Sequence, residues 1–248
     1  MQDRYVGDIG DFAKYSLLRA LTASSELRLG IVWCLFADES HNLDGRHTSY
    51  LQRGEFRSLD PVLHDRLALI VHSGRRSLKK ILRSKILPAE TISFDLPIAQ
   101  SGNNRTNRLI REAHRLKWIS KALAATAACD LVFFDPDNGL EIPSIPKHGP
   151  KAGKYVFLDE LDLFWQRGQS LIIYHHLNRS ASVEQQTQSL RKRLVSKFDG
   201  AALVRSVLFR RGSCRHFWIL GQAAHAAGLK SRVEAMLSSG WSGYFEFG

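Results

Sequence analysis

The segment 135–139, Asp-Pro-Asp-Asn-Gly, combines acidic and amide side chains directly after the apolar run 131–134. A carboxylate at the end of a buried strand, here Asp135, is held at the sheet edge and cannot turn away from it. Pro136 lacks an N–H group but keeps its carbonyl, so both residues offer acceptors to one donor, such as an amino group. The same five residues are also common turn formers. The segment therefore predicts either an amine-binding site or a plain turn.

Two further polar clusters follow apolar runs. The run 29–36 is followed by Asp38, Glu39, Asn42, Asp44, Gly45 and Arg46, and the run 170–174 by His175, His176 and Asn178. Ligands of open parallel sheets bind beyond the carboxyl ends of the strands, so we expect the three clusters to share one edge. Polar residues also cap ordinary surface loops, which is the alternative for each cluster taken alone.

The elements that must position these residues alternate between strand-like and helix-like patterns. Strands are predicted over 29–36, 91–95, 131–134 and 170–174, and helices over 11–24, 106–127, 158–166, 183–198 and 223–239. Two strand-like runs, 201–210 and 214–221, flank a short turn and predict an antiparallel hairpin, and a last short strand is expected near 244–247. The alternation indicates an α/β fold, a Rossmann-like three-layer sandwich with a mostly parallel sheet and a C-terminal antiparallel hairpin.

We expect one domain over 1–248, because no linker or repeat interrupts the alternation. It carries a helical insertion at about 60–87, where Asp60 can cap a helix that begins at Pro61. A second helix is expected over 75–86, with leucines and isoleucines on one face and basic residues on the other.

The charge of the chain is strongly basic, with 35 Lys and Arg against 24 Asp and Glu and a formal net charge of +11. This balance favours a polyanionic partner, nucleic acid first, although a basic protein without such a partner is the simpler alternative. Two basic helix faces, 75–85 and 105–121, are candidates for sequence-independent phosphate contacts. The residues expected to make them are Arg76, Lys79, Arg108 and Arg111, and ordinary solvated faces are the alternative.

Several classes of protein are disfavoured by composition. The cysteines, Cys34, Cys129 and Cys214, are odd in number and widely spaced, so they predict neither a disulfide framework nor a zinc site. No run approaches the about 18 consecutive apolar residues of a membrane-spanning helix, and the first residues carry mixed charge unlike a signal peptide. We therefore expect a cytoplasmic protein without a membrane partner, and its oligomeric state is left open.

With these residues placed, the chain resembles the class I S-adenosylmethionine-dependent methyltransferases, and among them the amino-methylating group with a D-P-P-Y-type motif. The match is Asp135-Pro136-Asp137-Asn138, and the closing hairpin is similar to the last two strands of that sheet. A more particular resemblance is to ribosomal-RNA adenine-N6 methyltransferases with an N-terminal G-N-x-A-D-x-x-K-H segment, whose place is taken by residues 7–15, Gly-Asp-Ile-Gly-Asp-Phe-Ala-Lys-Tyr. Their loop D-x-x-A-G-x-G-R-Y has a loose counterpart in 38–47.

The resemblance implies a role for each matched position. S-adenosylmethionine would be contacted by Asp38, Asn42, Asp44 and Gly45, and Lys14 and Asp11 would shape the side from which it enters. Asp135 and Pro136 would hold the target amine, with Asp137 and Asn138 completing the motif, and His175 or His176 would orient substrate or phosphate. This chain departs from the motif at its last two positions, where the family has proline and a stacking aromatic residue.

Two other functions remain open from the residues alone. Asp135, Asp137 and Glu141 form an acidic trio that suits Mg²⁺, as in a metal-dependent nuclease. The missing aromatic and the few glycines of the first loop would also suit a non-catalytic nucleic-acid-binding module with a degenerate methyltransferase fold.

Overall fold

The computed structural model describes residues 1–37, 45–98, 105–178 and 180–248. Within them a central sheet of seven strands has the order β2-β1-β3-β6-β8-β7-β9. The first four are parallel: β2 (Ile92–Phe94), β1 (Leu29–Val32), β3 (Leu131–Phe134) and β6 (Ser170–His176). The last three, β8 (Ser213–Gly221), β7 (Leu203–Arg211) and β9 (Phe245–Phe247), each run antiparallel to the preceding neighbour. The sheet is thus mixed, with a parallel half and an antiparallel half.

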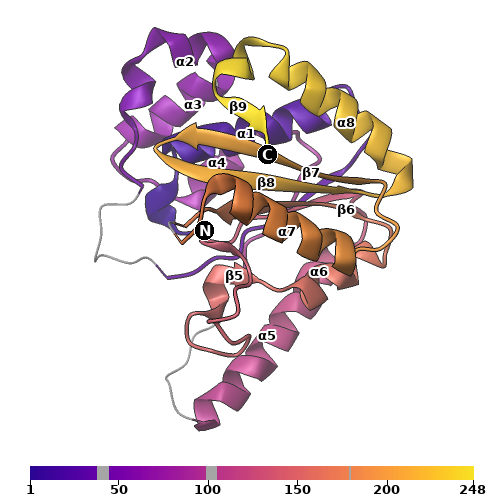
Figure 1. The fold of residues 1–248 in the computed structure, drawn as a ribbon. Helices are drawn as coiled ribbons and strands as arrows, with labels where there is room; N and C mark the ends of the chain where they lie inside the picture. Colours follow the sequence, from indigo (N-terminus) through magenta and orange to yellow (C-terminus); the bar gives the residue numbers. More distant parts are fainter. Residues whose placement is uncertain (38–44, 99–104, 179) are drawn as a thin grey trace.

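Helices cover both faces of this sheet (Figure 1). One face packs against α1 (Ile9–Thr22) and α8 (Ala223–Leu237), and the same hydrophobic core continues beyond α1 to α2 (Gly54–Leu59), α3 (Pro61–His72) and α4 (Leu78–Arg83). The other packs against α5 (Arg105–Ala125), α6 (Leu158–Trp165) and α7 (Val183–Lys197). Strand β3 shows why both faces of the sheet are covered. Leu131 and Phe133 pack in the hydrophobic core on the α1 side, and Val132 and Phe134 pack in the core on the α5 side. Successive strand side chains point to opposite faces, so an all-apolar strand needs a helix layer on each side.

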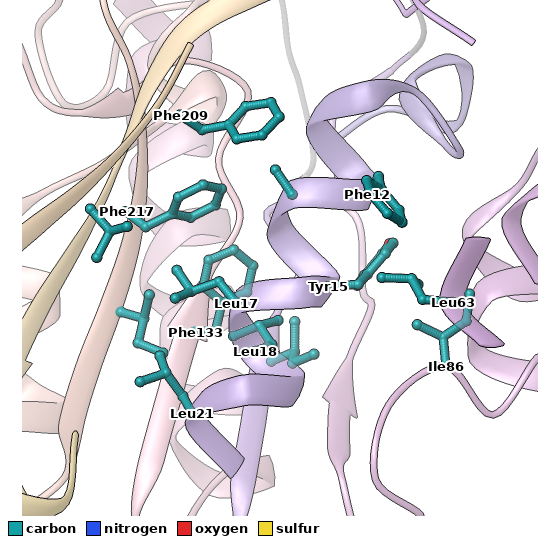
Figure 2. Close-up of a cluster of buried hydrophobic side chains, with 14 of the residues drawn as sticks. Phe12, Tyr15, Leu17, Leu18, Leu21, Leu63, Ile86, Phe133, Phe209 and Phe217 are labelled. Atoms are coloured by element: carbon teal, nitrogen blue, oxygen red, sulfur yellow. The ribbon is translucent and has the colours of Figure 1, made fainter. Parts of the chain in front are cut away.

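Helix α1 lies between the sheet and the helices of the 60–87 segment. Leu17 and Leu21 point toward the strands, whereas Phe12 and Tyr15 point toward Leu63 on α3 (Figure 2). All five side chains are fully buried, so α1 is held from two sides. Truncating a buried leucine of this kind typically costs about 2–5 kcal/mol. This packing fixes the position of α1, and the N-terminal turns of α1 reach the carboxyl edge of the sheet.

The predicted α/β class, the mostly parallel first half of the sheet and the closing antiparallel hairpin are confirmed. Strand 131–134 and the capped start of α3 are where the sequence places them, since the Asp60 side chain accepts from Leu63 N. The first strand is shorter than expected and ends at Val32, and α4 covers only part of 75–86.

The sequence did not predict three kinds of short element. These are α2, the two-stranded sheet of β4 (Gly139–Leu140) and β5 (Tyr155–Val156), and the 3-10 turns η1 (Asp3–Tyr5), η2 (Ser49–Gln52), η3 (Ala152–Lys154) and η4 (Gly240–Gly243). Among the described residues no helix is both long and apolar enough to cross a bilayer.

Candidate functional site

A cavity of about 350 Å³ opens at the carboxyl ends of β3 and β6. Its wall combines the first turns of α1, the turn after β3, the end of β6 and the turn between β7 and β8. The lining residues are Met1, Tyr5, Asp8, Gly10, Asp11, Lys14, Gly45, His47, Asp135, Pro136, Asp137, Asn138, Tyr174, His176, Gly212 and Arg215. The whole predicted motif 135–138 therefore faces one cavity together with Lys14, Asp11 and Gly45.

The ammonium group of Lys14 bridges two carboxylates. Its Nζ lies 2.7 Å from Asp11 Oδ1 and 2.8 Å from Asp135 Oδ2, and all three side chains are 5 % exposed or less. Nζ also lies 5.4 Å from the centre of the Trp33 ring. Burial lowers the pKa of this lysine, but the two carboxylates together outweigh it, so the pKa lies above its ordinary value. Lys14 is therefore a charged group inside the cavity wall.

Asp11 is the second member of this cluster and is held by its own helix start. Its Oδ2 accepts from Gly7 N at 2.9 Å, and its backbone N–H donates to the Asp8 side chain, which caps α1. Burial raises the pKa of Asp11 to about 6, against the lowering effect of Lys14. Asp8, Asp11 and Lys14 are three residues apart in turn, so their side chains lie on the same face at the start of α1.

Asp135 is fixed at the end of β3 by its backbone and by one carboxylate oxygen. Its N–H donates to Val32 O at 3.0 Å, which continues the ladder with β1, and Oδ2 binds Lys14. Its Oδ1 has no hydrogen-bond partner within the described part of the chain. The motif thus presents one open carboxylate oxygen to the cavity.

The second carboxylate of the motif serves the N-terminal segment. Asp137 Oδ2 accepts from Gln2 Nε2 at 2.5 Å, and Oδ1 lies 2.7 Å from the amino nitrogen of Met1. Asn138 follows with its backbone N–H bound to Lys154 O and its carbonyl bound to His176 N. Asp137 therefore shapes the cavity wall more than it offers a free acceptor.

The two adjacent histidines separate in the structure. His176 is exposed and lines the cavity. His175 is buried behind it, its Nδ1 accepts from Leu140 N at 3.0 Å, and burial lowers its pKa to about 3. Gly139, with φ of +116°, passes so close that an added Cβ would lie 2.4 Å from that nitrogen. His175 is thus a neutral residue that joins β4 to β6, and His176 is the one of the two that lines the cavity.

The residues expected around the cofactor are only partly described. Asp38, Asn42 and Asp44 lie outside the described residues, whereas Gly45 lines the cavity. Gly45 has φ of +80°, and its carbonyl accepts from Arg76 Nη1 at 2.5 Å. Arg76 therefore fixes the cavity wall, a different task from the phosphate contact expected for it.

The basic residues predicted to contact phosphate are partly exposed and partly buried. Lys79 and Arg108 are exposed, as a phosphate contact requires. Arg111 is buried, and its Nε donates to His148 O at 2.7 Å. Arg115 is buried as well, bound to both carboxylate oxygens of Glu160 at 2.6 and 2.8 Å. One side of α5 therefore holds the loop after β4 instead of facing solvent.

Arg215 is the clearest functional candidate that the sequence analysis missed. It is buried in the cavity wall on β8, opposite His176 in the strand register. A Cβ on Gly10 would lie 1.6 Å from Arg215 Nη1, so the glycine makes room for this guanidinium at the start of α1. Because β8 is antiparallel, its first residues reach the edge where the parallel strands end. The hairpin prediction contained that signal.

The acidic trio expected for a nuclease does not converge. Glu141 binds Leu158 N and Arg193 Nη2, each at 3.3 Å, and lines a second, shallower hollow beside α7. Asp135 is held by Lys14. Over the part of the chain that the structure describes, no three His, Cys, Asp or Glu side chains are arranged to hold a metal ion.

No family model, curated protein or solved structure matches this chain. We therefore infer the function from the cavity and from the sheet topology that forms it.

Proposed function

We propose that this chain is an S-adenosylmethionine-dependent methyltransferase that acts on an amino group, with a nucleic-acid base as the acceptor. The observation that carries the proposal is the placement of Asp135 and Pro136 on a cavity at the carboxyl edge of the sheet, with Asp135 Oδ1 open to a donor. The strand order adds support, because β8 lies reversed between β6 and β7 as in the sheet that the sequence resembles. We include in this proposal that the fold is Rossmann-like.

The charges of the cavity suit the cofactor. S-adenosylmethionine carries a positive sulfonium, and the wall holds four carboxylates, Asp8, Asp11, Asp135 and Asp137, against three cationic groups, the Met1 ammonium, Lys14 and Arg215. A volume of about 350 Å³ falls within the range of roughly 300–1,000 Å³ that is usual for small-molecule pockets. Gly45 is the described residue of the expected set that would hold it, whereas Asp11 is bound to Lys14. Lys14 already binds two carboxylates, so a direct cofactor contact is not its main task.

The chemistry of this chain is positional. An aromatic amino nitrogen is a weak nucleophile because its lone pair is delocalised, and acceptors at Asp135 Oδ1 and the Pro136 carbonyl would hold its hydrogens and orient the lone pair. When bound, S-adenosylmethionine would supply the methyl group for the new N–C bond, and the electron pair of its S–C bond would stay on sulfur. The proton released from nitrogen passes to Asp135 Oδ1 and from there to water at the cavity mouth.

A nucleic-acid acceptor is supported by the net charge of +11 and by the exposed positions of Lys79, Arg108 and His176. A base in a duplex would have to be extruded to reach the cavity floor. Phe133 and Phe134, directly before the motif, are buried on opposite faces of the sheet and do not reach the cavity. Tyr5 and Tyr174 line the cavity and are the aromatic side chains to which we assign stacking on the base.

The proposal is tested by transfer of radiolabelled methyl groups from S-adenosylmethionine to RNA and DNA. We expect incorporation with the wild type and a loss of about 100-fold or more with Asp135→Asn. The matched control is Asp130→Asn at the opposite end of β3, where the carboxylate accepts from Arg28 N, and it should retain transfer. Absence of incorporation into every nucleic acid offered would contradict the proposed acceptor.

A further inference from the structure

The Lys14 ammonium is buried in the cavity wall, yet the proposed transfer has no direct use for it. Its Nζ contacts Asp11 and Asp135 at 2.7 and 2.8 Å, and the Met1 sulfur lies 3.9 Å away. With its donors directed at the wall, Lys14 is not available to grip a ligand. Its effect on a ligand must therefore pass through Asp135.

A purely structural role explains this arrangement poorly. Apolar side chains already join α1 to the sheet along Leu17, Leu18 and Leu21. Replacing a buried ion pair by apolar residues is often neutral or stabilising. A buried lysine between two carboxylates therefore stabilises the packing of a helix on a strand no more than apolar side chains would. The cluster also lies at the cavity and not in the middle of the core.

The two carboxylate oxygens of Asp135 have different surroundings. Oδ2 is bound to Lys14, which stops rotation of the carboxylate, and Oδ1 has no partner among the described residues. An ionised carboxylate is an acceptor only, so the open oxygen selects ligands that donate. A base with an amino group donates at this position, whereas a base with a carbonyl there does not.

We propose that Lys14 is a positioning residue that fixes the Asp135 carboxylate in its acceptor state and orientation, with Asp11 as the counter-charge that holds Lys14 in place. This inference rests on the proposed function, and it assigns the pair to the acceptor side of the reaction instead of the cofactor side.

The test compares kcat, KM for the nucleic acid and calorimetric affinity for S-adenosylmethionine in folded variants. Lys14→Met leaves two carboxylates without a counter-charge and can fail to fold, so the decisive variant is the double replacement Lys14→Met/Asp11→Leu, which removes one charge of each sign. Lys230→Met, on an exposed pair of α8, is the control. Circular dichroism and thermal melting establish the folded state of each variant.

We expect the double variant to lose about 100-fold or more in kcat while its cofactor affinity changes less than about threefold. Lys14→Arg, which keeps the charge, should recover part of kcat. A folded double variant with unchanged kcat would overturn the positioning role, and so would a loss confined to cofactor affinity. If the wild type transfers no methyl group, the proposed function and this role both fall, whereas an active wild type with an unaffected double variant removes only the inference.

Discussion

The Lys14 ammonium nitrogen lies 2.8 Å from Asp135 Oδ2, although the two residues are 121 positions apart in the chain. The contact joins the first helix to the end of the central strand, inside the cavity that the predicted motif lines. It converts two sequence segments, 7–15 and 135–138, into one site.

The carboxyl group of Asp11 should titrate near pH 6 in the folded protein, because its burial raises the pKa from 3.8 to about 6. The folded state then binds more protons than the unfolded state between these two values, so this group makes the protein less stable as the pH rises from about 4 to about 6. The contribution is on the order of 3 kcal/mol. The groups that face it are Asp8, Lys14, Tyr15, Tyr50 and Asp135.

Urea unfolding of the wild type and of Asp11→Asn between pH 4 and pH 7 measures this contribution. The free energy of unfolding of the wild type relative to the variant should fall through this window and level off above pH 6. A difference that is constant, or that rises with pH, would contradict the titration assigned to Asp11.

His175→Ala should lower the free energy of unfolding by about 2–3 kcal/mol, since it leaves a cavity and removes the acceptor of Leu140 N. The exposed neighbour provides the control, and His176→Ala should change stability by less than about 0.5 kcal/mol. Chemical unfolding at pH 7 distinguishes the two. Equal effects would show that the histidines do not divide between core and cavity.

Gly139→Ala should be strongly destabilising. Its φ of +116° is unfavourable for any L side chain, and an added Cβ would lie 2.6 Å from the Cα of His175, where the backbone has no room to yield. Gly54→Ala at the start of α2 meets no atom within 4 Å and should be neutral or slightly stabilising. Thermal melting of the two variants checks this, and a Gly139→Ala protein as stable as the wild type would refute the close approach of β4 and β6.

Arg115→Met should cost about 3–5 kcal/mol, because the buried Glu160 carboxylate loses both guanidinium bonds and is left with the longer contact to Lys147, 3.5 Å from its Oε1. The Ala152 and Tyr155 carbonyls lose donors as well. The double variant Arg115→Met/Glu160→Leu should recover part of this loss. The exposed pair of Arg57 and Asp65 is the comparison, and breaking it should matter far less. Denaturant unfolding gives the coupling between the two replacements, and additive losses would argue against a buried pair.

Local patterns were sufficient to predict β3, the cap of α3, the closing hairpin and the place of Asp135 at the sheet edge. They could not show that Arg111 and Arg115 turn inward, because a basic helix face looks the same in sequence whether solvent or loop carbonyls receive it. Strands β4 and β5 have two residues each, too short for any periodicity. The contact of Lys14 with Asp135 depends on the packing of α1 against the sheet, which no local pattern contains.

The most direct test of the central claim is calorimetric titration of the purified protein with S-adenosylmethionine. We predict saturable binding with a Kd in the micromolar range, where 1 μM corresponds to roughly −8 kcal/mol. A protein that is folded by circular dichroism yet releases no heat of binding up to millimolar cofactor would contradict the assignment of the Lys14 and Asp135 cavity to a methyltransferase.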